Sequence, residues 1–388
     1  MTSRIEWVAS QCRLLATIAA EFDRTRPFAG LTIGTGIHLE PKTVAMLLAL
    51  RRGGARVLST GNLNTTQPES VDYLNANGVE AIGGPTQDEA VRDRHIDTIL
   101  DAEPDLILDN GGDMYARWLE RPYDHLRGGT EETTSGRIRL VPLRDRLNLP
   151  ILVINDSPIK HFAENRHAVG QSTVESFLRI TNMATNGRRV VVFGYGGVGK
   201  GVALSFQRAH ASVSVIELDP VLRMEALWDG FMVPDRDEAL AGADIVVTVT
   251  AARGVIGARD LAILADGVVL VNAGHLPVEI DVPGIAADPS VASYGPAADG
   301  ITTFRLTDGR SVHLLTDGHM VNLAGPRPLG NSIESMDVGF SLQARCLEAV
   351  ARGDVGPESC VVPVPRVIDE WVARAYVALG NAAAAQGS

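Results

Sequence analysis

Cysteine is scarce in this sequence: only Cys12, Cys346 and Cys360 occur among its 388 residues. Their odd number and wide spacing offer neither a disulfide framework nor the spacing of metal ligands. Such sparse cysteines suit a reducing compartment. We therefore expect no metal site and no disulfide-stapled fold.

Basic runs and long apolar stretches are also missing. The net charge is −12, so nucleic acid and anionic membrane are poor partners. No stretch has the apolar length that spanning a bilayer needs, and the charged N-terminal stretch MTSRIEWVASQCRLL does not fit a signal peptide. We expect a cytoplasmic globular protein that acts on a small molecule.

The chain does contain an alternation of strand-like and helix-like segments, which predicts an α/β fold with parallel sheets wound by helices. ARVLST, DLILDN and PILVIND read as short buried strands, and PKTVAMLLALRRGG reads as a helix with proline in its first turn. STVESFLRITNMATNG reads as a long helix that ends at Gly187. The apolar segments after it, at 189–193, 212–219, 243–250 and 267–275, predict a second wound sheet.

These segments predict two domains. The first covers 1–170 and the second 171–325, while the stretch 326–388 contributes helices at 333–351 and 366–379 that are too short for a domain of their own. We expect those helices to return to the first domain, and the last residues, GNAAAAQGS, to form a frayed end.

The stretch VVVFGYGGVGKG runs from an apolar strand into a turn with Gly194, Gly196 and Gly199, and then into a helix. The next strand ends at Glu217, about twenty residues on, where a carboxylate can accept hydrogen bonds from an adenosine ribose. The N-terminus of the helix favours a pyrophosphate. The pattern predicts a Rossmann domain that binds NAD rather than NADP, since Glu217 would repel a 2′-phosphate. A P-loop is excluded because Lys200 is followed by glycine instead of serine or threonine.

Four polar loops lie outside that domain or lead into it: GNLNTTQPES, LILDNGGDM, TEETTSGR and VINDSPIKHFAENRH. Several follow apolar strands, and ligands collect at the carboxyl ends of such strands. Each acid taken alone, including Asp109, Asp113, Glu131 and Glu132, could equally cap a helix or brace a turn. Lys160 with Glu164 could equally be a solvated helix pair, and His38 and His275 could equally be core histidines.

Several motifs together resemble the S-adenosylhomocysteine hydrolase family: NDSPIKHFAEN, EETTSG, GYGGVGKG, ELDP, NAGHLPVEID and GHMVNL. The resemblance runs from about residue 30 to 375. It implies a Rossmann NAD domain inserted in a substrate domain, a cytoplasmic location and a homo-oligomer. The family's C-terminal extension has no counterpart here, which leaves dimer and tetramer open.

The resemblance also implies a chemistry in which NAD is recycled. The nucleoside 3′-OH is oxidised to a ketone, the acidified 4′ proton is removed, and the 5′ substituent leaves by β-elimination. Water adds to the resulting alkene, and the ketone is reduced again.

Site residues follow from the resemblance together with the glycine turn. The implied catalytic residues are Lys160, Glu164, His275, His38 and Asn110, and the implied substrate contacts are Glu132, Asn331, Glu40, Asp109 and Met336. The implied cofactor contacts are Thr133, Thr134, Ser135, Asn165, Gly194, Gly196, Gly197, Val198, Gly199, Glu217, Thr250, Asn272, Gly274, His275 and Asn322.

The departures from the family pattern gather at the leaving-group end and the base end of the implied substrate. Asn110 stands where the family has an Asp implicated in acid–base work, and an amide cannot exchange a proton as a carboxyl does. Glu40 and Lys42, in HLEPK, replace the Thr and Glu that read the adenine, and Asn331 falls where a gate-forming His is usual.

We therefore expect a nucleoside substrate whose 5′ group differs from homocysteine. The simplest case is a free 5′-hydroxyl lost as water, a dehydratase that leaves a 4′,5′-unsaturated nucleoside. S-adenosylhomocysteine hydrolysis, NAD-assisted sugar epimerisation and an inactive NAD-binding regulator remain the alternatives.

Overall fold

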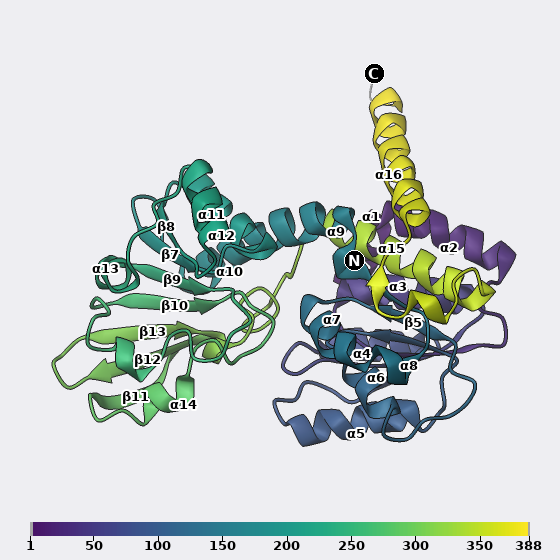
Figure 1. Ribbon diagram of the computed structural model, residues 1–388, viewed down its shortest axis with the longest axis horizontal. Helices are drawn as coiled ribbons and strands as arrows, with labels where there is room; N and C mark the ends of the chain where they lie inside the picture. Colours follow the sequence, from purple (N-terminus) through teal and green to yellow (C-terminus); the bar gives the residue numbers. More distant parts are fainter. Residues whose placement is uncertain (1–2, 387–388) are drawn as a thin grey trace. The chain divides into compact units, whose positions relative to one another are not determined.

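The computed structural model describes residues 3–386, which form two compact units (Figure 1). One unit comprises the chain up to His161 and again from Ile333 onward; the other is Phe162–Ser332. Among the described residues, no helix is both long enough and apolar enough to cross a membrane.

The first unit is built on a seven-stranded parallel sheet with the order β14-β6-β5-β4-β1-β2-β3. Its strands are β1 (Thr32–Gly36), β2 (Arg56–Thr60), β3 (Glu80–Ile82), β4 (Leu106–Asp109), β5 (Gly128–Glu131), β6 (Ile151–Val153) and β14 (Val362–Pro363). In β4, Leu106 and Leu108 belong to one hydrophobic core and Ile107 to another. Both faces of the sheet are therefore covered, which explains why its strands read as continuous apolar runs.

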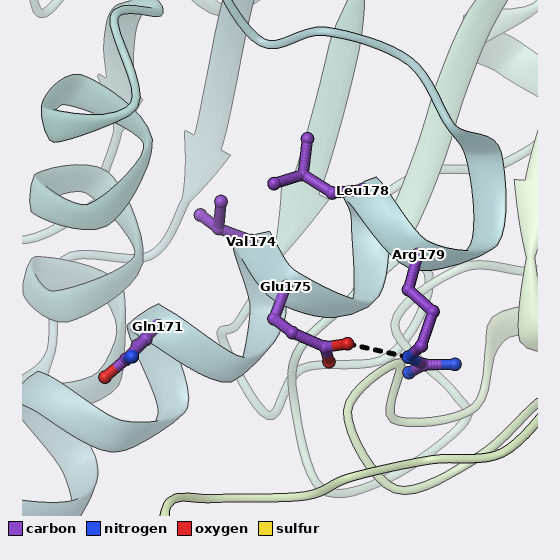
Figure 2. A pocket seen from close by; sticks show the side chains of 5 residues that line it. All are labelled: Gln171, Val174, Glu175, Leu178 and Arg179. Carbon is purple, nitrogen blue, oxygen red and sulfur yellow. Dashed lines mark hydrogen bonds and ion pairs between the residues drawn. The ribbon is translucent and has the colours of Figure 1, made fainter.

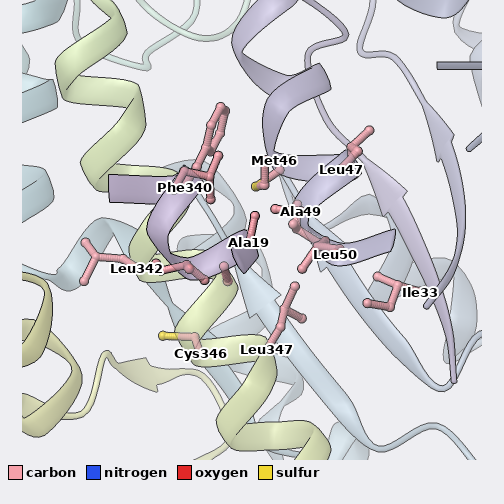
Figure 3. Close-up of a cluster of buried hydrophobic side chains, with 14 of the residues drawn as sticks. Ala19, Ile33, Met46, Leu47, Ala49, Leu50, Phe340, Leu342, Cys346 and Leu347 are labelled. Atoms are coloured by element: carbon pink, nitrogen blue, oxygen red, sulfur yellow. The ribbon is translucent and has the colours of Figure 1, made fainter. Parts of the chain in front are cut away.

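The helices of this unit are α1 (Arg4–Gln11), α2 (Arg13–Thr25), α3 (Pro41–Arg52), α4 (Pro68–Ala76), α5 (Glu89–Leu100), α6 (Asp113–Trp118), α7 (Thr134–Leu140), α8 (Arg144–Leu147), α9 (Pro158–Lys160), α15 (Ile333–Arg352) and α16 (Arg366–Gln386). Helix α15 packs on α2 and α3, although some three hundred residues separate them (Figure 1). Figure 3 shows Phe340, Leu342 and Leu347 of α15 in the same cluster as Met46 and Leu50 of α3.

The second unit has a seven-stranded sheet with the order β11-β12-β13-β10-β9-β7-β8. Its strands are β7 (Arg189–Phe193), β8 (Ser212–Ile216), β9 (Ile245–Thr248), β10 (Val268–Asn272), β11 (Val291–Ala298), β12 (Ile301–Leu306) and β13 (Ser311–Leu315). Its helices are α10 (Val169–Thr181), α11 (Gly197–Arg208), α12 (Pro220–Trp228), α13 (Arg236–Gly242) and α14 (Val282–Ala286). The fold class is α/β with two mainly parallel sheets, as expected from the alternation of segments.

Three details differ from the sequence expectations. Strands β11 and β12 pair antiparallel with each other and with β13, so one edge of the second sheet is not parallel. Helix α10 ends at Asn182, which takes the left-handed conformation with φ 53°, before Gly187 is reached. Residues 380–386 extend α16 instead of fraying, in accord with the high helix propensity of alanine, and 387–388 lie outside the described residues.

Candidate active site

The polar residues of the first unit follow the carboxyl ends of neighbouring parallel strands. His38 comes after β1, Asn62 after β2, Asn110 after β4, Glu132 after β5, and Lys160 after β6 by way of the short helix α9. Because these strands are neighbours in the sheet and point the same way, their ends lie along one edge.

A chain of buried hydrogen bonds joins four of these side chains. Lys160 Nζ donates to Glu132 Oε1 at 3.0 Å, and Asn110 Nδ2 donates to Glu132 Oε2 at 2.7 Å. Asn62 Nδ2 donates in turn to Asn110 Oδ1 at 2.9 Å. Arg92 Nη2 donates to the Asn62 amide oxygen at 3.3 Å and so closes the chain on its outer side. Lys160, Glu132, Asn110 and Asn62 are all buried, so a cation and a carboxylate are held together away from water.

The environment keeps Glu132 ionised. Burial raises the pKa of its carboxyl, but Lys160, the Asn110 hydrogen bond and the nearby His38 together bring that pKa below its ordinary value. His38 is half-buried, and its Nδ1 is hydrogen-bonded to Thr65 Oγ1 at 2.8 Å. The first unit thus offers a fixed carboxylate, an amine and an imidazole in one neighbourhood.

A second buried ion pair lies just beyond His38. Lys42 Nζ is 2.7 Å from Glu40 Oε2, and both side chains are at most 5% exposed. Glu40 precedes the first residue of α3, and Lys42 lies in the first turn of that helix. This pair occupies the two positions at which the sequence departs from the adenine-reading motif.

Asp109 and Met336 are placed less directly. Asp109 is 1% exposed and accepts backbone N–H groups of Asn110, Met114 and Tyr115, so it braces the loop that carries Asn110. Burial, with the charge of Asp113 adding, raises the pKa of Asp109 to about 7. Met336 is buried near the start of α15.

Thr133, Thr134 and Ser135 lie at the N-terminus of α7, in the first unit. Thr133 caps the helix by accepting the Gly136 N–H at 2.9 Å, and its hydroxyl is 3.0 Å from Ser135 Oγ. These hydroxyls lie immediately beside Glu132 in the chain.

The glycine turn of the second unit has the geometry of a dinucleotide-binding turn. Gly194 has φ 99°, and a Cβ there would lie 2.7 Å from Val249 O; a Cβ on Gly199 would lie 2.0 Å from Gly194 O. At Gly196 an added Cβ would meet no atom within 4 Å, so space lies open over the turn. Gly197 and Val198 then start α11. Tight packing at two glycines and open space at the third fit the close approach of a pyrophosphate.

Glu217 follows β8 directly and is held by backbone donors. Its Oε2 accepts Tyr195 N–H at 2.7 Å, and its Oε1 accepts the N–H groups of Leu218 and Asp219 at 2.6 and 3.1 Å. A carboxylate has about four acceptor sites, so capacity remains for a ribose hydroxyl.

The loops after β9 and β10 are joined by a residue that the sequence analysis did not single out. Glu279 is fully buried; its Oε2 accepts Thr250 N–H at 2.8 Å and its Oε1 accepts Ala251 N–H at 2.8 Å. A Cβ on Gly274 would lie 1.9 Å from Glu279 Oε1, so only glycine fits against this carboxylate.

Asn272 ends β10 and is also fully buried. Its Nδ2 donates to Leu276 O and Gly318 O at 3.0 and 2.8 Å, and its Oδ1 accepts Gly274 N–H at 2.8 Å. Asn272 therefore shapes the turn that carries the half-buried His275.

In the second unit, Asn322 Nδ2 donates directly to Asn331 Oδ1 at 3.2 Å, and both residues also contact Ser172, which the sequence analysis missed. Asn322 Nδ2 donates to Ser172 Oγ at 3.0 Å, and Ser172 Oγ donates to Asn331 Oδ1 at 3.0 Å. Asn331 Nδ2 lies 3.5 Å from Glu164 Oε1. Glu164 and Asn165 are buried on a π-helical segment, His161–Ala168, and such segments are frequent at functional sites.

Comparisons with known proteins identify the family of this chain. The S-adenosyl-L-homocysteine hydrolase NAD binding domain matches residues 165–327. The adenosylhomocysteinase of Thermotoga maritima is 37% identical over 377 residues, which cover 96% of this chain and 92% of the relative. The chain belongs to the adenosylhomocysteinase family.

Two further relatives are a hydrolase with a different printed name and a second adenosylhomocysteinase. The S-inosyl-L-homocysteine hydrolase of Methanopyrus kandleri is 37% identical over 95% of this chain and 88% of its own, and the adenosylhomocysteinase of Pyrococcus abyssi is 38% identical over 96% and 88%. Because the chain belongs to the adenosylhomocysteinase family, its cofactor is NAD and the protein is an enzyme.

A hollow of about 510 Å³ lies along α10 of the second unit, lined by Gln171, Val174, Glu175, Leu178 and Arg179 (Figure 2). Its floor is apolar, and its charged groups already pair, since Arg179 Nε donates to Glu175 Oε1 at 2.7 Å. None of these residues belongs to the site expected from the adenosylhomocysteinase motifs.

The motifs did not indicate three residues of the candidate site, for different reasons. Asn62 lies in a polar loop after a predicted strand, so its loop carried a usable signal. Ser172 and Glu279 carried none, because each acts through partners that only the folded chain brings near.

Proposed function

We propose that this protein is an NAD-dependent enzyme that removes the 5′ substituent of a nucleoside after transient oxidation of its 3′-hydroxyl. The observation that carries the proposal is the buried chain Lys160–Glu132–Asn110, which places a cation and a fixed carboxylate at the ends of three neighbouring strands. A structural ion pair would not need such a position.

Gly194, Gly196, Gly199 and Glu217 are the residues that would hold NAD, which supplies hydride acceptance and return at the 3′ carbon of the sugar. Glu132 has acceptor capacity beyond its bonds to Lys160 and Asn110, so we assign it the ribose hydroxyls. We assign Lys160 to the 3′-hydroxyl proton and Glu164 to the same end of the sugar, as the family resemblance implies.

With the 3′ carbon at the ketone level, the 4′ C–H bond becomes acidic. A base takes the 4′ proton, and the electron pair left on carbon forms the 4′,5′ double bond as the 5′ group departs. That group leaves with the bonding pair and needs a proton. Asn110 cannot supply one, because an amide does not titrate as a carboxyl does. We assign this proton to His38, which lies close enough to Glu132 to lower the pKa of the Glu132 carboxyl.

Hydrolysis of a nucleoside homocysteine thioether is the first candidate for the overall reaction. It is supported by relatives at 37% identity whose printed names are adenosylhomocysteinase and S-inosyl-L-homocysteine hydrolase. In this reaction, water adds to the alkene after homocysteine leaves.

Loss of water from a free 5′-hydroxyl is the second candidate. It is favoured by Asn110 at the position of an acid–base Asp. Without a titrating group at position 110, re-addition of water to the alkene loses one means of proton transfer.

The NAD-loaded protein should be incubated separately with S-adenosylhomocysteine, S-inosylhomocysteine and adenosine, and the products weighed by mass spectrometry. Release of homocysteine supports the hydrolase, and loss of one water from adenosine supports the dehydratase. No product, with flat NADH absorbance for all three, would contradict the proposal and favour a non-catalytic NAD-binding role.

Lys160→Ala should lower turnover at least about 10³-fold on whichever substrate is used, because acid–base groups contribute roughly that much. NAD binding should persist, since no described contact of the glycine turn involves Lys160. Arg117→Ala is a matched control: it removes a cation of the same unit that pairs with Asp93 and Asp97 near the surface. Equal losses in the two variants would sink the assignment.

A further inference from the structure

The acidic residue next to Glu132 makes as many contacts as any residue of the site. Glu131 is fully buried at the end of β5 and belongs to no role assigned above. We propose that Glu131 is a positioning residue that ties the Asn110 loop to the Glu132 turn, and so sets the distance between those two side chains. This inference rests on the proposed function, in which Glu132 and its neighbours hold the sugar.

The contacts of Glu131 reach both segments. On the loop side, its Oε1 accepts Gly111 N–H at 3.1 Å and its Oε2 accepts Gly112 N–H at 3.0 Å. On the turn side, its Oε1 accepts both the N–H and the hydroxyl of Thr133 at 2.7 Å. One carboxylate therefore receives four hydrogen bonds from two loops.

These donors lie directly beside the residues of the site in the chain. Gly111 follows Asn110, and Thr133 follows Glu132. Glu131 therefore holds the peptide group that comes directly after each of these two site residues. The Asn110 Nδ2 to Glu132 Oε2 distance of 2.7 Å depends on both loops keeping this register. A shift of either loop by 1 Å would break that bond.

Asp109 holds the two ends of the loop through the N–H groups of Asn110 and Met114, but not the two glycines between them. Gly111 and Gly112 carry no side chain and have φ of 114° and 75°, so this stretch cannot be anchored by side-chain packing. Its backbone donors are instead received by a buried carboxylate, as buried polar groups require.

Space for the carboxylate is also specific. A Cβ on Gly136, in α7, would lie 2.1 Å from Glu131 Cδ. Glycine in a helix interior is otherwise unfavourable, so its presence here fits the need to admit Glu131.

Burial and the nearby Asp109 raise the pKa of Glu131 well above its ordinary value, although the hydrogen bonds from Thr133 and Gly111 act in the opposite direction. In either protonation state both oxygens can accept a hydrogen bond. A glutamine at this position cannot reproduce that arrangement, because its amide nitrogen can only donate.

The test is Glu131→Gln in the full-length, NAD-loaded protein. Hydrogen exchange at Gly111, Gly112 and Thr133 should accelerate, and kcat should fall about 100-fold, the cost of misplacing a reacting group by about 1 Å. KM for whichever of the three nucleosides proves to be the substrate should change less than kcat, and NAD affinity should stay the same. If kcat survives while these amides are exposed, the positioning role is wrong.

Two further variants separate positioning from general damage. Glu348→Gln changes a buried carboxylate that pairs with Arg345 in the same unit; it should lower Tm without lowering kcat. Gly136→Ala should raise helix propensity yet lower kcat, because its methyl group displaces the Glu131 carboxylate. A Gly136→Ala enzyme with full activity would overturn the proposal.

The exchange measurement does not depend on any reaction. If the wild type turns over no nucleoside, the proposed function fails, while faster exchange at the three amides still reports the tether. If the wild type is active and exchange is unaltered in Glu131→Gln, only the tether fails.

Discussion

The two units use the same device for different purposes. In each, one fully buried glutamate receives backbone donors from a loop at the carboxyl end of a sheet: Glu131 in the first unit and Glu279 in the second. Each also lies against a glycine that admits it, Gly136 or Gly274. A carboxylate is suited to this work because it accepts several N–H groups at once.

The side chains that these loops present differ in kind. The loops that Glu131 braces carry Asn110 and Glu132, and Lys160 and His38 lie close to Glu132; the carboxylate, the lysine and the histidine can exchange protons. Around Glu279, Thr250 and Asn272 offer neutral hydroxyl and amide groups that bind without titrating, although the same turn also carries His275. A site that moves protons needs titratable groups, whereas a site that holds a cofactor needs fixed ones.

Among the substitutions that test this comparison, we expect the largest loss of NAD affinity and stability in the glycine turn. Gly199→Ala should weaken NAD binding about 100-fold and lower Tm, because its methyl group would meet the Gly194 carbonyl and overpacking of this kind costs about 3 kcal/mol. Isothermal titration with NAD and a thermal melt measure both quantities.

Gly196→Ala is the matched control for that turn. Gly196 has φ −70°, and an added Cβ meets no protein atom, so Tm should not change. NAD affinity should still fall about tenfold, since the methyl group takes space that the pyrophosphate needs. Unaltered NAD affinity in Gly196→Ala would mean that the cofactor does not approach this turn.

Much of the fold follows from the sequence because buried parallel strands are apolar on both faces. β4 and β9 are recognisable for this reason. The antiparallel strand β11 was not, because VASYGPAA is largely exposed and contains glycine and proline, so it has the composition of a loop.

The site divides in the same way. Asn110, Glu132 and Lys160 each follow an apolar strand, so the parallel topology that the alternation predicts also places them along one edge. Ser172 and Asn322 are 150 positions apart, and their contact depends on how α10 packs, which no local pattern encodes. For Glu131, the sequence left a structural bracing role and a role in the ligand site open as alternatives.

A medium effect is expected from Glu279→Gln. Replacing one oxygen by an amide nitrogen removes an acceptor for Thr250 or Ala251, and a hydrogen bond to a charged group is worth about 1.5–3 kcal/mol. NAD affinity should fall about tenfold as the loop after β9 loosens. Exchange at Gly111 and Gly112 should be unaffected, in contrast to Glu131→Gln. If both variants altered both units, the two tethers would not be independent.

The last effect concerns the pH dependence of stability in the first unit, and it is small at any single step of pH. Burial, with the charge of Asp113 adding, raises the pKa of Asp109 from 3.8 to about 7. The protonated form is thus favoured in the folded chain, and the stability it contributes is complete below pH 3.8 and lost as the pH rises to about 7. Asp109→Asn does not titrate, so it should remove a slope of up to about 1.4 kcal/mol per pH unit across this window.

Urea unfolding of both proteins between pH 4 and 8 measures that slope, with hydrogen exchange in β4 to assign it to the first unit. Asp97→Asn is a control that should leave the slope in this window unchanged: hydrogen bonding with Arg117 lowers the pKa of Asp97, so its contribution is lost only as the pH falls below its ordinary value of 3.8. Equal slopes in the wild type and Asp109→Asn would mean that Asp109 is ionised when folded. Asp109 would then add a negative charge beside Glu131, and the bracing of the Asn110 loop would have to work against that repulsion.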